Sequence, residues 1–226
     1  MDCFLEGGTV CIIGVNMSAP LSAIIFDVDG VLLDSFEENY ETCCATFAAL
    51  GLEKPTREFF GAHNHLGILD TIRSVMEIKD EAHEREILTV VNNLDIKHTR
   101  EAALPPGALE VVPQLAETYP LGVVTGRLRS HIFSGALLVL KNHFSAVVGY
   151  EDTVHHKPHP EPLLQAAKHL SVPQETCVYI GDAPTDVAAA HAAGMRVISF
   201  GRVSLPNADA HTDTFSDLPN LVSRSS

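Results

Sequence analysis

The sequence predicts an α/β protein built on a doubly wound parallel β-sheet, with a small helical domain inserted after the first strand. Short apolar runs rich in β-branched residues recur along the chain and are bounded by Gly, Asp or Pro, which is typical of parallel strands buried on both faces. Helical patterns separate these runs, and strands that alternate with helices indicate a Rossmann-like sheet. One long stretch after the first run carries only helical pattern, which indicates the inserted domain.

Five of the apolar runs are predicted to be strands of this sheet. The helical patterns between them include "EPLLQAAKHL" and "TDVAAAHAAG", and the second pattern ends on Gly194, a residue type favoured just after a helix. The five predicted strands are residues 23–26, 121–124, 146–148, 178–180 and 197–200.

The helical insert is predicted to be a cap domain that spans residues 37–103. Its segments "NYETCCATFAALG", "GILDTIRSVMEI" and "AHEREILTVVNNL" have the apolar spacing of helices. The segment "LPPG", which begins at Leu104, and the stretch after Ser35 are expected to be the two hinges. Residues 22–36 and 104–226 would then form the catalytic core, and residues 1–21 an N-terminal extension.

The composition excludes several classes of protein. The chain has 226 residues, a formal net charge of −14 and 46% hydrophobic residues. This charge argues against nucleic acids and membranes as partners, because both are bound through basic surfaces. No apolar run approaches the roughly 20 residues of a membrane-spanning helix. The five cysteines are an odd number without metal-ligand spacing, and the first residues carry no basic side chain, so we expect a cytoplasmic protein with reduced thiols.

The first strand-like run leads directly into two carboxylates, Asp27 and Asp29, in the stretch "AIIFDVDGVLLDS". If the strand extends that far, both side chains point to the same face of the sheet. Two carboxyl groups held close together can differ in protonation, so that one acts as a nucleophile and the other as a general acid and base. Taken alone, the pair also fits an acidic turn that merely ends a strand.

Polar residues also follow the later runs, and the carboxyl ends of parallel strands share one edge of a sheet, where ligands bind. Thr125 and Gly126 offer a hydroxyl and an unhindered N–H to a phosphoryl oxygen, and Arg127 beside them is a candidate substrate contact. Lys157, in "HHKPHPEP", is a candidate catalytic cation. Taken singly, these residues also fit an ordinary turn, an arginine at a helix start and a surface lysine.

Two further acids, Asp182 and Asp186, form the pattern G-D-x-x-x-D and are expected on one face of a helix start. The alternative is a capping residue followed by a solvated first-turn acid. Together with Asp27 and Asp29 they would place four carboxylates at one edge of the sheet. Such a cluster suggests a divalent cation, and its hard oxygen ligands favour Mg²⁺.

Four segments, "DVDGVLLDS", "VVTGR", "KPHPEP" and "IGDAPTD", resemble in order and spacing the four motifs of the haloacid dehalogenase superfamily. The helical insert resembles the cap of the branch that contains phosphoglycolate phosphatases and β-phosphoglucomutases. The resemblance implies that Asp27 attacks phosphorus and forms an aspartyl-phosphate. It also implies that Asp29 protonates the leaving oxygen and then activates water.

The same resemblance implies roles for the other motif residues. Thr125 and Gly126 would hold the phosphoryl group, and Lys157 would steady the charges of Asp27 and the phosphate. Mg²⁺ would be held by the Asp27 carboxylate, the backbone carbonyl of Asp29, Asp182, and Asp186 as ligand or supporting residue.

The site residues and this resemblance together predict a Mg²⁺-dependent phosphatase that acts on a small phosphorylated metabolite as a monomer or homodimer. One alternative is a phosphomutase of the β-phosphoglucomutase type, which needs cap groups for a second phosphate, and Arg73 and His63 are the candidates. Another alternative is a non-catalytic, phosphate-binding regulatory protein that keeps the pocket without turnover.

Overall fold

The computed structural model of the chain describes residues 20–64, 66–94 and 101–223. These residues divide into two compact units: one contains residues 20–34 and 104–223, and the other contains the described residues between 35 and 103. Residues 1–19, most of the expected N-terminal extension, lie outside the described residues. None of the helices in the described part of the chain is long and apolar enough to cross a bilayer.

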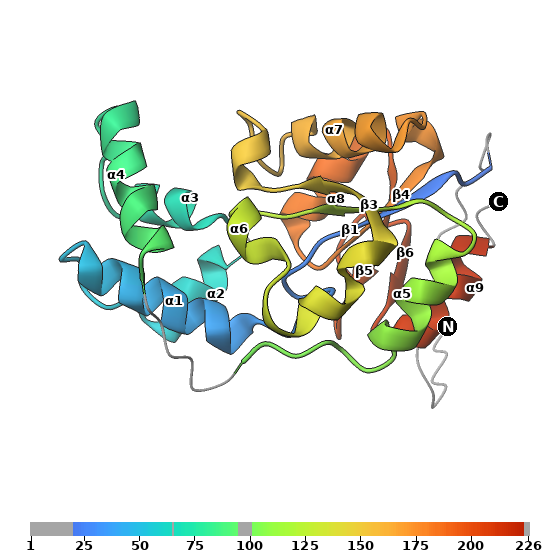
Figure 1. Cartoon of the computed structure of the whole chain (residues 1–226), viewed down its shortest axis with the longest axis horizontal. Coiled ribbons are helices and arrows are strands. Elements are labelled where there is room, and N and C mark those ends of the chain that lie inside the picture. The colour runs from blue at the N-terminus through green and yellow to red at the C-terminus, as the bar shows by residue number, and fades with distance from the viewer. Residues whose placement is uncertain (1–19, 65, 95–100, 224–226) are drawn as a thin grey trace. The chain divides into compact units, whose positions relative to one another are not determined.

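A parallel sheet of six strands, counted over the described residues, forms the centre of the first unit (Figure 1). The strand order is β3-β2-β1-β4-β5-β6. The first strand, β1, therefore lies in the middle, with β2 and β3 on one side and β4, β5 and β6 on the other. This is the doubly wound arrangement, and the predicted fold class is confirmed. The strands are β1 (Ala23–Phe26), β2 (Leu121–Val124), β3 (Phe144–Val148), β4 (Cys177–Gly181), β5 (Arg196–Phe200) and β6 (Ala210–Thr212).

The edge strand β6 is absent from the sequence prediction. Its three residues, Ala-His-Thr, are too few and too polar to stand out as an apolar run. The strand forms because β5 offers a free edge, along which Ile198 pairs with Ala210 and Phe200 pairs with Thr212. Tertiary pairing rather than local hydrophobicity therefore fixes this element.

Helices cover both faces of the sheet. On one face, Ile25 and Tyr179 belong to a buried apolar cluster that also contains residues of α7 and α8. On the other face, the ring of Phe200 packs edge-on against Phe215 with ring centroids 5.1 Å apart, next to α5 and α9. The helical segments of this unit are α5 (Ala108–Ala116), α6 (Arg129–Ile132), η1 (Gly135–His143), η2 (Tyr150–Asp152), α7 (Glu161–Leu170), η3 (Gln174–Thr176), α8 (Pro184–Ala192), η4 (Phe215–Asp217) and α9 (Leu218–Ser223).

The second unit consists of helices throughout its described elements. The side chains of Thr56 and Asp80 cap α2 and α4 by accepting N–H groups from Phe59 and His83. Gly51, with φ +71°, ends α1 in the left-handed conformation that favours glycine. The helices are α1 (Phe36–Ala49), α2 (Arg57–His63), α3 (Ile68–Arg73) and α4 (Glu81–Asn92).

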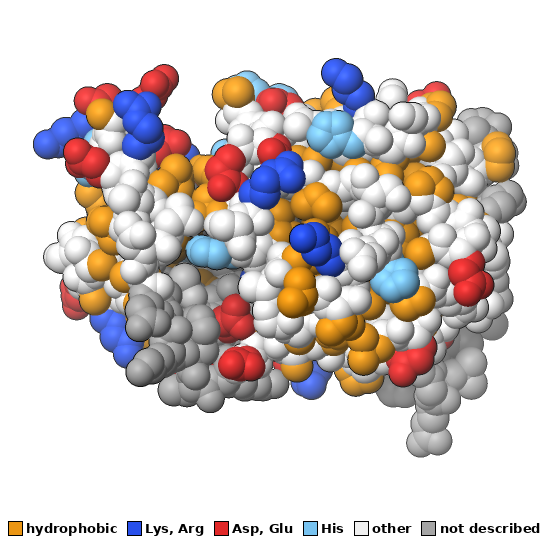
Figure 2. Space-filling model, in the orientation of Figure 1, with side chains coloured by type: hydrophobic (Ala, Val, Ile, Leu, Met, Phe, Trp, Pro, Cys, Tyr) orange, Lys and Arg blue, Asp and Glu red, His pale blue; other side chains and the backbone are white. Residues whose placement is uncertain are grey.

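The surface charges follow the acidic composition. On the face drawn in Figure 2, the described Lys and Arg side chains are scattered among other side chains and do not gather into a continuous basic surface. On this face, an anionic ligand would be attracted by individual cations rather than by a broad positive field.

Candidate active site

The turn after β1 holds the first two candidate residues. The strand ends at Phe26, but the Asp27 N–H still donates to the carbonyl of Ile180 at 2.9 Å, so the Asp27 backbone stays tied to β4. Val28 then turns inward and is fully buried, and its N–H donates to the Asp27 carboxylate at 2.8 Å. The strand stops before Asp27, so the condition on which the same-face expectation for Asp27 and Asp29 rested is not met.

The turn continues through a residue that must be glycine. Gly30 has φ +77°, and a Cβ atom at this position would overlap the carboxylate of Asp182. Gly181 plays the same part beneath Asp186, whose Cβ and carboxyl atoms would lie 2.5 Å from an added Cβ. These two glycines therefore let the carboxyl groups of Asp182 and Asp186 come close to the backbone at the ends of β1 and β4.

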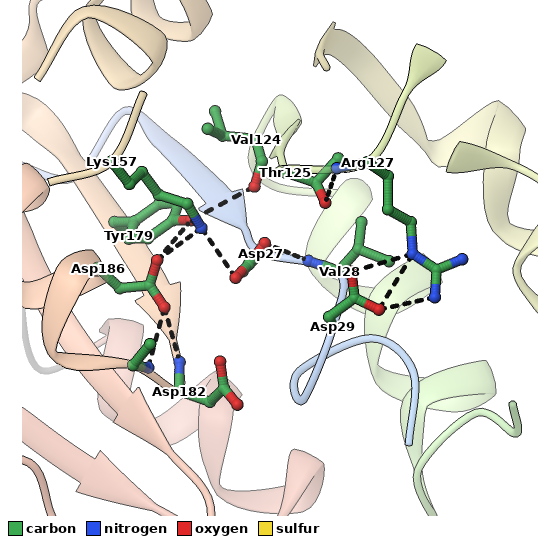
Figure 3. Close-up of polar contacts among 11 residues, drawn as sticks. Asp27, Val28, Asp29, Val124, Thr125, Arg127, Lys157, Tyr179, Asp182 and Asp186 are labelled. Atoms are coloured by element: carbon green, nitrogen blue, oxygen red, sulfur yellow. Dashed lines mark hydrogen bonds and ion pairs between the residues drawn. The ribbon is translucent and has the colours of Figure 1, made fainter. Parts of the chain in front are cut away.

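Lys157 is the hub of the site. Its ammonium donates to Asp27 at 2.9 Å, to Asp186 at 2.6 Å and to the hydroxyl of Tyr179 at 3.1 Å (Figure 3). The side chain of Lys157 is 9% exposed, and that of Asp186 is fully buried. The interpretation of Lys157 as a surface lysine is therefore wrong.

Asp186 is held by the start of α8. One carboxylate oxygen accepts the N–H groups of Asp182 and Ala183, both at 3.0 Å, while the other accepts from Lys157. The helix begins at Pro184, and Ala183 is its capping residue. Asp182 therefore precedes the helix, and the expectation that Asp182 and Asp186 share a helix face is wrong, as is the capping role for Asp182.

Three carboxyl groups, those of Asp27, Asp182 and Asp186, gather near the single ammonium of Lys157. Burial raises the pKa of Asp27 well above its usual range, although Lys157 works against this shift. Burial, reinforced by Asp186, raises the pKa of Asp182 to about 7. Burial lowers the pKa of Lys157, but the charges of Asp186 and Asp27 outweigh it and raise this pKa well above its usual value. Additional positive charge would favour the ionised carboxylates.

A divalent cation would supply this charge. Asp27, Asp182 and Asp186 each offer one carboxylate oxygen, and these oxygens all lie within 4.8 Å of one another. Hard oxygen ligands of this kind suit cations such as Mg²⁺ and Ca²⁺. The donor set therefore fits a divalent metal, with Asp186 already engaged by backbone N–H groups and Lys157.

Thr125 and Arg127 lie on the other side of Asp27 from Lys157 (Figure 3). The N–H of Thr125 donates to Val148 at 3.1 Å and extends the pairing of β2 with β3, while its hydroxyl accepts the N–H of Arg127 at 3.2 Å. Gly126 is exposed in the turn between them. The guanidinium of Arg127 forms an ion pair with Asp29, with a shortest distance of 2.6 Å.

Tyr179 belongs to the site but is absent from the candidate residues of the sequence analysis. Its fully buried hydroxyl contacts Lys157 and lies 3.3 Å from both Asp186 and the carbonyl of Val124. In the sequence it reads as one more core residue of a strand. The signal that could have found it is strand alternation, which places Tyr179 on the same face as Gly181 in β4.

Comparisons with known proteins agree with this architecture. The sequence profile of the haloacid dehalogenase-like hydrolases matches residues 24–200. The phosphoglycolate phosphatase of Nitrosococcus oceani is 30% identical over 224 residues, which cover 89% of this chain and 96% of that protein. The pyrophosphatase PpaX of Bacillus mycoides is 28% identical over 218 residues, covering 90% and 98%.

A solved structure shows the same fold. CbbY from Rhodobacter sphaeroides, in complex with phosphate, superposes with a TM-score of 0.69 at 23% identity and covers 88% of this chain and 96% of its own. The profile match spans most of the chain, including the ends of β1, β2 and β4 where the candidate residues lie. The chain therefore belongs to the haloacid dehalogenase-like hydrolases.

Proposed function

We propose that this protein is a Mg²⁺-dependent phosphatase that hydrolyses a small phosphorylated metabolite through a phosphoryl-enzyme intermediate on Asp27. The observation that carries the proposal is the environment of Asp27. Its carboxylate lies 2.9 Å from the Lys157 ammonium and has oxygens of Asp182 and Asp186 within 4.8 Å. The relatives named phosphoglycolate phosphatase and pyrophosphatase support a reaction at phosphorus.

In the first step, a carboxylate oxygen of Asp27 attacks phosphorus as the bond from phosphorus to the leaving oxygen breaks. Asp29 gives its proton to the leaving oxygen. In the second step, Asp29 takes a proton from a water molecule, and the oxygen of this water attacks phosphorus. The phosphorus–Asp27 bond breaks, so inorganic phosphate leaves and the Asp27 carboxylate is restored.

The remaining residues would hold the transferred group. The Thr125 hydroxyl and the Gly126 N–H would donate to phosphoryl oxygens, and Lys157 would offset their charge. Phosphoryl transfer depends mainly on such positioning and charge neutralisation. Bound Mg²⁺ would supply further positive charge at the phosphoryl oxygens, and Asp27, Asp182 and the Asp29 carbonyl would hold it. Asp186 would position Lys157 and the backbone that carries Asp182.

The contacts of the helical unit favour a phosphatase over a phosphomutase. A mutase needs cap cations for a second phosphate, and Arg73 is the main candidate. Its guanidinium already forms ion pairs with Asp70 at 2.6 Å and with Glu84 at 2.5 Å. His63 is packed against the ring of Phe59. A mutase would have to break these contacts to bind the second phosphate.

The cellular compartment and the oligomeric state stay predictions. Cys43, Cys44 and Cys177 are all free thiols among the described residues, as suits a cytoplasmic protein. We expect the protein to act in the cytoplasm as a monomer or homodimer.

The direct test is phosphate release from a panel of phosphorylated metabolites, measured with Mg²⁺ and with EDTA. We expect turnover that requires Mg²⁺ and is lost in Asp27→Asn. Asp213→Asn, at an exposed position, is the matched control and should keep full activity. Absence of phosphate release from every compound by the folded wild-type protein would contradict the proposal, as would full activity of Asp27→Asn.

A further inference from the structure

The carboxylate expected to act as general acid and base is held in an ion pair. The Arg127 guanidinium contacts both oxygens of Asp29: Nε lies 3.0 Å from each oxygen, and one terminal nitrogen lies 2.6 Å from the nearer one (Figure 3). The two residues are 98 positions apart in the sequence, so only the fold brings them together. A forked contact of this kind fixes the direction of the carboxylate as well as its charge.

The backbone of Arg127 is anchored firmly. Its N–H donates to the Thr125 hydroxyl at 3.2 Å, and its carbonyl accepts the N–H of Tyr150 at 2.9 Å. Gly149 approaches so closely that a Cβ there would lie 3.1 Å from this same carbonyl. The backbone of Arg127 is therefore held by the turn that would bind the phosphoryl group. The guanidinium can move only by rotation about the side-chain bonds of Arg127.

Among the described residues, Lys157 is the other cation that contacts the candidate acids, and it is less suited to a second negative charge on the substrate. Lys157 is committed to Asp27 and Asp186 deep in the site. The ion pair of Arg127 and Asp29 is nearer to solvent, because its two side chains are 11% and 26% exposed. An incoming carboxylate or phosphate presents the same paired oxygens as Asp29, so it can take the place of Asp29 on the guanidinium without leaving that group unpaired.

We propose that Arg127 selects substrates with a second anionic group close to the leaving oxygen, and that its transfer from Asp29 to this group frees Asp29 for catalysis. The proposal rests on the proposed phosphatase function. The substrate class is a short phosphate compound whose leaving group carries a carboxylate or a second phosphate. With a neutral leaving group, Asp29 stays in its ion pair with Arg127, and the enzyme turns over the substrate more slowly.

The test compares three probes of similar size, in Mg²⁺: 2-phosphoglycolate, inorganic pyrophosphate and ethyl phosphate. We expect wild type to prefer at least one of the two anionic probes over ethyl phosphate in kcat/KM. In Arg127→Met this preference should fall by about tenfold or more, because a charge-assisted contact is lost. The anionic probe should lose affinity, seen in KM, while kcat for ethyl phosphate should rise because Asp29 is freed. The probe that loses more identifies the second anion as a carboxylate or a phosphate.

Two further variants separate recognition from a structural role. Arg127→Lys keeps the charge without the fork and should restore part of the preference. Arg129→Met removes an exposed neighbouring arginine that pairs with Asp152, and it should leave the preference unchanged. An equal loss of kcat/KM for all three probes in Arg127→Met would overturn the proposed exchange of Arg127 between Asp29 and the substrate. It would leave the proposed phosphatase function standing. Failure of the wild type to hydrolyse any probe or panel compound would overturn the phosphatase function itself, and the exchange with it.

Discussion

Replacing Lys157 with Met should destabilise the protein as well as inactivate it. The ammonium is the positive partner of two buried acids, Asp27 and Asp186. These two residues are 7% and 0% exposed. A methionine of similar length fills the space but leaves both carboxyl groups without a cation. Removing one partner of a buried ion pair costs about 3–5 kcal/mol. This is a large fraction of the roughly 5–15 kcal/mol that stabilises a typical protein.

The loss is measurable by urea denaturation followed by circular dichroism, in EDTA. It corresponds to a fall in melting temperature of roughly 6–20 °C, at about 2–4 °C per kcal/mol for a domain of this size. Lys168→Met is the matched control, because Lys168 is exposed near the end of α7, and it should change stability by less than about 0.5 kcal/mol.

A double variant tests the cause. If uncompensated charge is responsible, then Lys157→Met combined with Asp186→Asn should be more stable than Lys157→Met alone by at least about 0.5–3 kcal/mol. A loss of less than about 1 kcal/mol in Lys157→Met, or further destabilisation of that protein by Asp186→Asn, would show that uncompensated buried charge is not the cause.

Three other predictions concern the metal-binding turn, the pH dependence of stability and the buried thiols. Gly30→Ala should weaken Mg²⁺ binding by about 10–100-fold, because a Cβ overlaps the Asp182 carboxylate; unchanged affinity by calorimetry would contradict this placement. Burial raises the pKa of Asp182 to about 7, so its contribution to folding is full below about pH 4 and is lost as the pH rises through 7. Because Mg²⁺ needs the ionised carboxylate, the gain in melting temperature on adding Mg²⁺ should be larger at pH 8 than at pH 5; an equal gain at both would count against it. Burial raises the pKa of Cys43 to about 12 and that of Cys177 to about 11, so both should resist iodoacetamide in the native protein, with peptide mass spectrometry showing modification only after unfolding; rapid native modification would show that these thiols are accessible.

The sequence was sufficient to predict the fold class because buried parallel strands leave a strong local signal. Runs such as 23–26 and 121–124 are continuous apolar segments, and the structure gives strands with these bounds. Strand β6 was not predicted, because its pairing with β5, and not its own composition, makes it a strand. Local pattern therefore suffices where burial on both faces dictates composition, and fails at an edge.

The site shows the same division. Asp27, Lys157, Asp182 and Asp186 are brought together because the carboxyl ends of parallel strands meet at one edge. The contact of Arg127 with Asp29 depends on side-chain directions across 98 residues and leaves no local signal. The close approach of Gly30 to Asp182 is equally invisible, because the sequence shows only a common Asp-Gly turn.

The role of Asp27 as nucleophile is tested most directly by trapping the phosphoryl group on this residue. Asp29→Asn should be incubated with Mg²⁺ and acetyl phosphate, quenched in acid and digested for mass spectrometry. Acetyl phosphate has a good leaving group that needs little proton donation, so the first step should proceed, while hydrolysis should be slowed because the proposed mechanism uses Asp29 to activate water. We expect the peptide that contains Asp27 to gain one phosphoryl group, hydroxylamine to remove this group, and the Asp27→Asn protein never to acquire it. A phosphoryl group on another residue, or turnover by wild type with no phosphoryl group trapped on Asp27 in Asp29→Asn, would show that Asp27 is not the nucleophile.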